Sequence, residues 1–298
     1  MAHYLDPKND LIFKRIFAEH PKLLISFLNA IMPLKQDRYI EEIHYLPSEQ
    51  VPHFKGKKNS IVDVKCIDNE KNQFIVEMQM FWSEAFNNRM VFNAGKAYIK
   101  QLNKNEDYDL LQPVYTLAII NDIFDRKTEQ FYHHYQIVNR ENTDEIIHGL
   151  EFVLVELPKF CPQSWEHRKL AALWLRFLSE VDENLRSLPP ELEANNEIRF
   201  AAELCKEAAL SPEELAIYEA FEDAIRIEKT IRNASLREGM AQGKAIGLEE
   251  GRIEGKAEGK EEVVINSRNA GIPIETIVKI TGLTVEQITG ILKRHKLI

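Results

Sequence analysis

The chain has 298 residues, 44% of them hydrophobic, with a formal net charge of −9 and a pI near 5.6. This acidic balance argues against a protein coated in basic charge for non-specific nucleic-acid binding, although it leaves room for a local basic groove. The three cysteines lie far apart, and no signal region or run of about 18 apolar residues occurs, so we expect a soluble cytoplasmic protein without disulfides, zinc or membrane spans.

The first 160 residues alternate between helical and extended patterns. Two helices are predicted first, with Asp6 as the cap and Pro7 as the first residue of the earlier one, at 6–20 and 21–32. A longer amphipathic helix is predicted at 84–104. Strands are predicted at 40–47, 60–68, 73–81, 113–122, 131–139 and 151–157. The pattern indicates an α/β domain over 1–160 with a mixed central sheet flanked by helices.

The remaining chain reads as helical and forms an all-α C-terminal region. A helical region is expected over 161–236, with helices at 166–181, 196–209 and 212–234. Residues 237–262 form a repeat with glycine at every fourth position, and 263–298 predict two short helices. Ser211 with Glu214, and Thr284 with Gln287, have the spacing of capping boxes.

The stretch FIVEMQM, residues 74–80, raises a question of chemistry. Side chains alternate across a strand, so Glu77 and Gln79 share one face while the apolar residues take the other. The strand at 60–68 precedes it after a short polar turn, which predicts a hairpin that brings Asp63 to the same place. Two close carboxylates need a shared proton or a cation, and Mg²⁺ is held by one or two carboxylates.

A plainer interpretation of these residues stays open. A carboxylate on a strand is more often solvated or paired, and Lys65 is a candidate partner for Glu77. The neighbouring His133 and His134 fall on opposite faces of one expected strand, so they cannot hold a metal jointly and we interpret them as structural.

The order of these motifs resembles a known superfamily. A helix, then Asp on one strand of a hairpin, then Glu-x-Gln on the next strand, is similar to the PD-(D/E)XK nucleases. LDPKNDLIFKRIFAEHPKLLISFLNAIMP, followed by IVDVKC, FIVEMQM and a helix ending in AYIKQL, resembles the Rpn family of recombination-promoting nucleases, also called transposases. The resemblance covers about residues 1–160 and implies a restriction-endonuclease-like core.

The resemblance implies a metal-dependent endonuclease linked to DNA recombination or mobile elements. Asp63 and Glu77 would then hold Mg²⁺ or Mn²⁺, with the backbone carbonyl of Met78 as a third ligand. Gln79 stands where many superfamily members have lysine, and it can orient groups by hydrogen bonds but carries no charge. The missing cation must then come from the metal or from another side chain, with Lys65 and Lys96 as candidates.

Three further residues are assigned accessory roles. Asp10 and Lys14 are spaced as an ordinary helix salt bridge, whereas the resemblance implies that Asp10 faces the metal with Lys14 nearby. Arg89 on the following helix is a candidate for phosphate contact, although a single arginine is more often a surface residue.

The glycine repeat predicts a helix that needs a partner. Six helical glycines cost on the order of 6 kcal/mol relative to alanine, and Glu250, Glu254 and Glu258 repel at four-residue spacing, as do the interleaved basic residues. We therefore expect a contact between two copies of the chain, in a direction that the sequence leaves open. A flexible charged linker is the alternative.

The last segment resembles the helix-turn-helix of resolvases and transposases. Its second helix would contact DNA through Gln287, Thr289, Lys293 and Arg294, although small helical hairpins also serve as dimerising units. The sequence thus predicts a DNA endonuclease that pairs through its C-terminal helical region. The alternative is a catalytically silent DNA-binding or protein-interaction factor on a nuclease scaffold.

Overall fold

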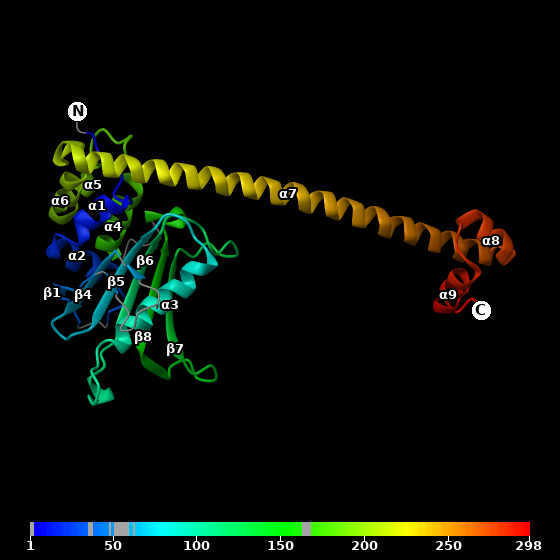
Figure 1. The fold of residues 1–298 in the computed structure, drawn as a ribbon, viewed down its shortest axis with the longest axis horizontal. Coiled ribbons are helices and arrows are strands. Elements are labelled where there is room, and N and C mark those ends of the chain that lie inside the picture. Colours follow the sequence, from blue (N-terminus) through cyan, green and yellow to red (C-terminus); the bar gives the residue numbers. More distant parts are fainter. Residues whose placement is uncertain (1–2, 35–37, 48, 51–59, 62, 163–167) are drawn as a thin grey trace. The chain divides into compact units, whose positions relative to one another are not determined.

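The computed structural model describes residues 3–34, 38–47, 49–50, 60–61, 63–162 and 168–298. They belong to two compact units, Met1–Ile225 and Arg226–Ile298, whose elements are labelled in Figure 1. No helix in the described part of the chain is both long and apolar enough to cross a membrane.

A mixed six-stranded sheet with the order β1-β4-β5-β6-β8-β7 forms the centre of the first unit. β5, β6 and β8 run parallel, while β1–β4, β4–β5 and β7–β8 are antiparallel pairs. The strands are β1 (Ile43–Tyr45), β4 (Val64–Asp68), β5 (Gln73–Gln79), β6 (Val114–Ile120), β7 (Tyr132–Val138) and β8 (Ile146–Glu156). A separate pair consists of β2 (Glu49–Gln50) and β3 (Ser60–Ile61). The predicted α/β fold with a mixed sheet is confirmed.

One face of the sheet is covered by a helical cluster that carries the main core. Its helices are α1 (Asp10–Phe17), α2 (Pro21–Ile31), α4 (Lys169–Glu180), α5 (Pro190–Glu193) and α6 (Asn196–Leu204). Trp174 is fully buried at its centre and lies 5.6 Å from the ring of Phe17 and 5.5 Å from that of Phe27. Val64, Phe74 and Val76 project into this core from the hairpin, as their alternation predicts.

The other face of the sheet is covered by α3 (Glu84–Ile99), which Figure 1 shows crossing in front of the strands. Ala94 and Ala97 of α3 pack on Ile75 and Val114. Phe86 and Met90 form a second cluster with side chains of β6 and β8. The face that carries Glu77 and Gln79 is therefore the one that α3 covers.

Two predicted helix boundaries are wrong. α1 begins at Asp10, with Asn9 rather than Asp6 as its cap, because the Asp6 carboxylate accepts the Lys8 N–H in a turn while the Asn9 side chain accepts the Leu11 N–H. α3 ends at Ile99 rather than 104. A polar turn follows it, in which Asn105 has a φ of 78° that a helix does not accommodate.

The long helix α7 (Pro212–Asn269) replaces the two helices expected at 212–234 and 237–262. Its start has the predicted capping box, since the Ser211 hydroxyl accepts the Glu214 N–H and the Glu214 carboxylate accepts the Ser211 N–H. The glycine repeat is helical throughout.

The second unit ends in two short helices, α8 (Ile274–Thr281) and α9 (Val285–Arg294). They pack on the last turns of α7 through a small core that includes Val264, Ile277 and Ile288. The predicted capping box of Thr284 with Gln287 begins α9.

Candidate active site

Two carboxylates meet where β4 begins and β5 ends. β4 pairs with β5 in a register that matches Val64 with Val76, and continuing it by one residue sets Asp63 opposite Glu77. Asp63 lies just before β4, and its Oδ2 accepts the backbone N–H of Met78 at 2.7 Å. The hairpin therefore brings these carboxylates together, as its alternation predicts.

Glu77 lies beneath α3, and its side chain is only 5% exposed. Its Oε1 accepts a hydrogen bond from Asn93 Nδ2 at 3.2 Å, and its Oε2 lies 3.4 Å from Arg89 Nη2. The buried Oδ1 of Asn93 has no hydrogen-bond partner within the described chain. An oxygen that can accept a hydrogen bond from water or ligate a hard cation thus lies beside the Glu77 carboxylate.

The two carboxylates share one nearby arginine, Arg89, which pairs with Glu77. Burial, together with the charges of Glu77 and Asp10, raises the pKa of Asp63 to about 7, although the Met78 N–H and the Lys14 charge oppose this shift. Burial also raises the pKa of Glu77, while Arg89 and Asn93 oppose this shift. A bound cation would relieve this electrostatic cost.

Gln79 has a cationic partner that compensates for the missing lysine. Its Oε1 accepts a hydrogen bond from Arg89 Nη2 at 2.6 Å, and its Nε2 donates to the carbonyl of Phe81 at 3.0 Å. Arg89 extends from α3 across the ring of Phe86, 5.0 Å from its centroid. A positive charge therefore lies at the position where a lysine at 79 would place one.

Residues 7–233 match the family model described as PD-(D/E)XK nuclease family transposase, which is well over half of the chain. The chain belongs to this family. No curated protein and no solved structure shows significant similarity to it. Membership supports a nuclease role connected with mobile elements, and the sheet and helices of the chain agree with a restriction-endonuclease-like fold.

The other predicted residues of the site are Asp10, Lys14, Lys65 and Lys96. Lys14 Nζ pairs with Asp10 at 2.8 Å, and both charges act on the pKa of Asp63, so the salt bridge lies near the site. Lys65 is buried, and burial together with Lys100 lowers its pKa. Among the described contacts it forms no ion pair with Glu77, which pairs with Arg89 instead, so the plainer interpretation of a paired carboxylate stays open with a different partner. Lys96 Nζ lies over the ring of Phe92, at 5.3 Å.

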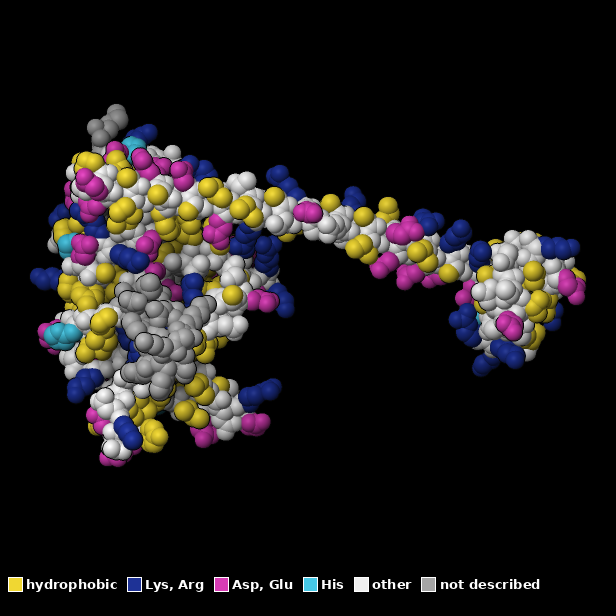
Figure 2. All heavy atoms as spheres, in the orientation of Figure 1, with side chains coloured by type: hydrophobic (Ala, Val, Ile, Leu, Met, Phe, Trp, Pro, Cys, Tyr) yellow, Lys and Arg dark blue, Asp and Glu magenta, His cyan; other side chains and the backbone are white. Residues whose placement is uncertain are grey.

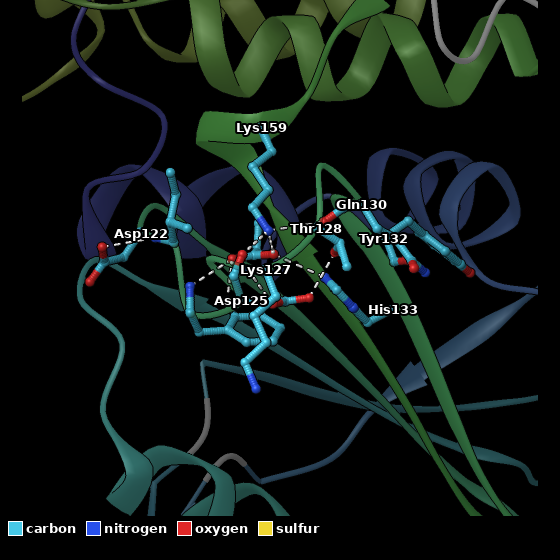
Figure 3. A network of polar contacts seen from close by, with 11 residues as sticks. Asp122, Asp125, Lys127, Thr128, Gln130, Tyr132, His133 and Lys159 are labelled. Carbon is cyan, nitrogen blue, oxygen red and sulfur yellow. Dashed lines mark hydrogen bonds and ion pairs between the residues drawn. The ribbon is translucent and has the colours of Figure 1, made fainter.

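A polar network near the pair of carboxylates, shown in Figure 3, was not predicted from the sequence. Glu156, at the end of β8, is fully buried. Its carboxylate accepts the N–H groups of Phe124 at 2.6 Å and Asp125 at 3.1 Å, and it lies 2.9 Å from His133 Nε2 and 2.7 Å from Lys159 Nζ. One carboxylate thus anchors the loop after β6 and the start of β7.

This network reaches the site through a stack of aromatic rings. The ring of Phe124 stacks on Trp82 at 4.4 Å, and Trp82 contacts Phe86 edge-on at 5.5 Å. Asp122 also accepts the N–H of Trp82 at 3.0 Å. Phe86 then supports the Arg89 guanidinium. The one sequence signal for this arrangement was the cluster of aromatic residues on both sides of the end of β5.

The two adjacent histidines have structural roles, as predicted. His133 contacts Glu156, whereas His134 Nε2 lies 3.1 Å from Glu151 on the opposite face of β8. No group of three or more His, Cys, Asp or Glu side chains converges on a common point in the part of the chain that the structure describes. The pair of carboxylates is therefore the strongest candidate centre.

The predicted DNA-contact residues of α9 are partly committed to contacts within the chain. The Gln287 side chain accepts the Thr284 N–H as part of the capping box, and Arg294 pairs with Glu261 at 3.1 Å. Lys293 is exposed, and Thr289 is half-buried.

Proposed function

We propose that this chain is a divalent-metal-dependent endonuclease that hydrolyses phosphodiester bonds in DNA. The observation that carries the proposal is the pair of buried carboxylates, Asp63 and Glu77, which the hairpin holds opposite each other and whose pKa values burial raises. Family membership supports a nuclease rather than another class of enzyme.

The donor set fits a hard divalent cation such as Mg²⁺ or Mn²⁺. Asp63 and Glu77 would hold it, with the backbone carbonyl of Met78 as a further oxygen ligand, and two carboxylates suffice because Mg²⁺ keeps several waters. Asp10 is close enough to act on Asp63 and is an accessory candidate. A bound cation supplies water activation and neutralises charge that develops on the phosphate.

The side chains of the protein have separate roles around that centre. Arg89 provides a positive charge that attracts the scissile phosphate, and this charge belongs to the protein rather than to the metal. Gln79 fixes the Arg89 guanidinium with its Oε1 and retains one amide N–H that can orient the attacking water. Asn93 holds one Glu77 oxygen, which leaves the other oxygen facing Arg89.

We further propose that two copies of the chain pair through the C-terminal helical region, so that two active sites act on one duplex. Exposed Lys293, together with Arg294, would then contact phosphate oxygens and contribute affinity rather than sequence specificity. Gln287 is a weaker candidate for base contact because its amide oxygen caps α9.

The test is nicking of supercoiled plasmid by the purified full-length chain in Mg²⁺ and in Mn²⁺. We expect Asp63→Ala to lower the nicking rate at least about 100-fold, since a lost metal ligand removes several kcal/mol of stabilisation. Glu70→Ala is the matched control, because Glu70 is a carboxylate at the other end of the same hairpin and pairs with Arg38. Its nicking rate should match that of the wild type.

Circular dichroism establishes whether each variant folds. A folded wild type that binds DNA but does not nick it with either metal refutes the proposal and favours the catalytically silent factor. Equal nicking by folded Asp63→Ala refutes the assigned site.

A further inference from the structure

The middle of α7 has a face that the rest of its own unit leaves uncovered. Gly251, Gly255 and Gly259 lie within about 40° of Gly255 on one face, whereas the glycines that precede them turn progressively away from it. A side-chain carbon added at any of these three meets no atom within 4 Å. Exposed apolar side chains occur along the same part of the helix, where Leu248 is 75% exposed. Figure 2 shows this mixture of apolar and charged side chains along the helix.

Two rows of opposite charge flank the glycine face. With about 100° of rotation per residue, and with Gly255 as the reference, Glu250, Glu254 and Glu258 lie roughly 60° to 140° to one side. Arg252, Lys256 and Lys260 lie roughly 60° to 140° to the other side. The acidic and basic rows are therefore related to each other by reflection across the glycine face.

These charges are almost all unpaired within the chain. Arg252 pairs with Glu249 at 2.6 Å. The three acidic residues of the row, together with Lys256 and Lys260, have no ion pair among the residues that the structure describes. Since each row also repels itself at four-residue spacing, a partner that carries both charges would stabilise this part of the helix.

The rest of the unit packs on the opposite side of α7. Ile253 and Ala257, which lie about 160° from Gly255, line a groove of about 710 Å³ between α7 and α9, and the basic row of Arg252, Lys256 and Lys260 borders the same groove. Val264, on the same side, is buried in the core with α8 and α9. Glu261 holds that side closed by pairing with Arg294 and His295. A partner for the glycine face must therefore come from outside the unit.

We propose that this face binds the same face of a second copy of the chain, with the two α7 helices parallel. A two-fold axis parallel to the helices brings opposite flanks together, as it does for the e and g positions of parallel coiled coils. The acidic row of each copy then faces the basic row of the other on both flanks. The glycines allow the backbones to approach closely enough for these charges to meet.

An antiparallel pair is excluded by the same symmetry. A two-fold axis perpendicular to the helices brings each flank against the equivalent flank of the partner. Acidic rows would then face acidic rows, and basic rows would face basic rows, at any axial offset. Nucleic acid is also a poorer partner, because the acidic row flanks the same face with as many charges as the basic row.

The inference rests on the subunit pairing proposed above and gives it a surface and a direction. It does not rest on catalysis. A chain that pairs as described but does not cut DNA would uphold this inference and refute the nuclease proposal.

The first experiment reverses one row at a time in the full-length chain. Glu250→Lys/Glu254→Lys/Glu258→Lys makes both flanks basic, and Arg252→Glu/Lys256→Glu/Lys260→Glu makes both acidic. Each variant alone should self-associate at least about tenfold more weakly in sedimentation equilibrium, and an equimolar mixture should dimerise again. Glu213→Lys/Glu219→Lys/Glu228→Lys, on the same helix, is the charge-matched control and should dimerise like the wild type.

The outcomes of this experiment are decisive. A wild type that stays monomeric throughout the concentration series, with or without duplex DNA, overturns the inference. Dimerisation of either reversed variant at wild-type strength overturns it as well, as does failure of the mixture to pair.

The second experiment tests direction with single cysteines in a Cys161→Ser background, since Cys161 is the exposed cysteine. Leu248→Cys should crosslink to itself through a short bis-maleimide, because parallel helices bring the two copies of this residue to the same height. In an antiparallel pair centred on Gly255 they would be separated by roughly 21 Å along the helix. Ile246→Cys, 59% exposed on the opposite side, is the control. Equal crosslinking of the two variants, or none with Leu248→Cys, overturns the parallel arrangement.

Discussion

Replacement of Arg89 by alanine should slow DNA nicking about 10- to 50-fold. The guanidinium lies 3.4 Å from the Glu77 carboxylate, and at that distance two unit charges interact by about 5 kcal/mol at an effective dielectric constant of ~20 and by about 1 kcal/mol in water. Since the arginine side chain is 48% exposed, a value of about 1.4 to 2.3 kcal/mol is reasonable for a phosphate at the same distance, and each ~1.4 kcal/mol is tenfold in rate.

A second substitution distinguishes loss of charge from loss of packing. Gln79→Lys in the Arg89→Ala background should recover most of the rate, because the lysine returns a cation to the same place. Lys104→Ala is the matched control, since Lys104 is an exposed cation in the turn that follows α3. Its plasmid-nicking rate should equal that of the wild type.

The reasoning fails if folded Arg89→Ala nicks plasmid as fast as the wild type. It also fails if Gln79→Lys gives no recovery although the double variant folds. Gln79→Lys alone should not raise the rate, because a lysine beside Arg89 sets two like charges against each other.

Two other measurements test the electrostatics. In EDTA the ionisation of Asp63 should lower the stability of the protein by roughly 2–3 kcal/mol between pH 5 and pH 8. The pKa of Asp63 is about 7 in the folded protein against an ordinary 3.8, so the protonated carboxyl favours the fold at low pH and this stabilisation is lost as the pH rises through 7. Urea midpoints of the wild type should show this slope, and those of Asp63→Asn should vary less with pH. Glu156→Ala should destabilise the fold by about 3–5 kcal/mol, because it leaves buried partners of the carboxylate unpaired. Glu145→Ala, at an exposed carboxylate between β7 and β8 that accepts a hydrogen bond from Asn139, should cost about 1 kcal/mol or less. Similar thermal midpoints for the two variants would contradict the role given to the network.

The hairpin was predictable from sequence because its information is local. The alternation of Phe74, Val76 and Met78 against Glu77 and Gln79 fixes which side chains share a face, and a short polar turn fixes the pairing of the strands. Opposed positions for Asp63 and Glu77 follow from that pattern alone. The fully buried strand β6 was predictable for the same reason, since it is apolar throughout.

The contact between Arg89 and Gln79 was not predictable in the same way. It depends on the rotation of α3 relative to β5, which is set by the packing of Ala94, Ala97 and Phe86 on the sheet. Single residues on a helix carry no information about that rotation. The network around Glu156 is harder still, because it joins groups 23 to 32 residues apart in the chain.

The boundary of α1 shows how two good local signals compete. Asp6 followed by Pro7 has the composition of a helix start, but Asn9 can also cap a helix. In the structure Asn9 is the cap of α1. The reason is tertiary. The Asp6 N–H donates to the Tyr218 hydroxyl and Asn9 Nδ2 donates to Glu222, so this segment is fixed against α7 before the helix begins.

In the nuclease centre proposed above, Arg89 would supply the charge that a lysine at position 79 supplies in other members of the superfamily. A lysine there is held by one strand and points wherever its own rotamer allows. Here the charge arrives from α3, and Gln79 and the Phe86 ring restrain it from two sides. An arginine held in this way loses less conformational freedom when it binds phosphate, and its planar donors suit bidentate contact. Because Phe86 contacts Trp82, and Trp82 in turn stacks on Phe124, the position of the cation depends on the loop that Glu156 anchors, far from β5 in the sequence.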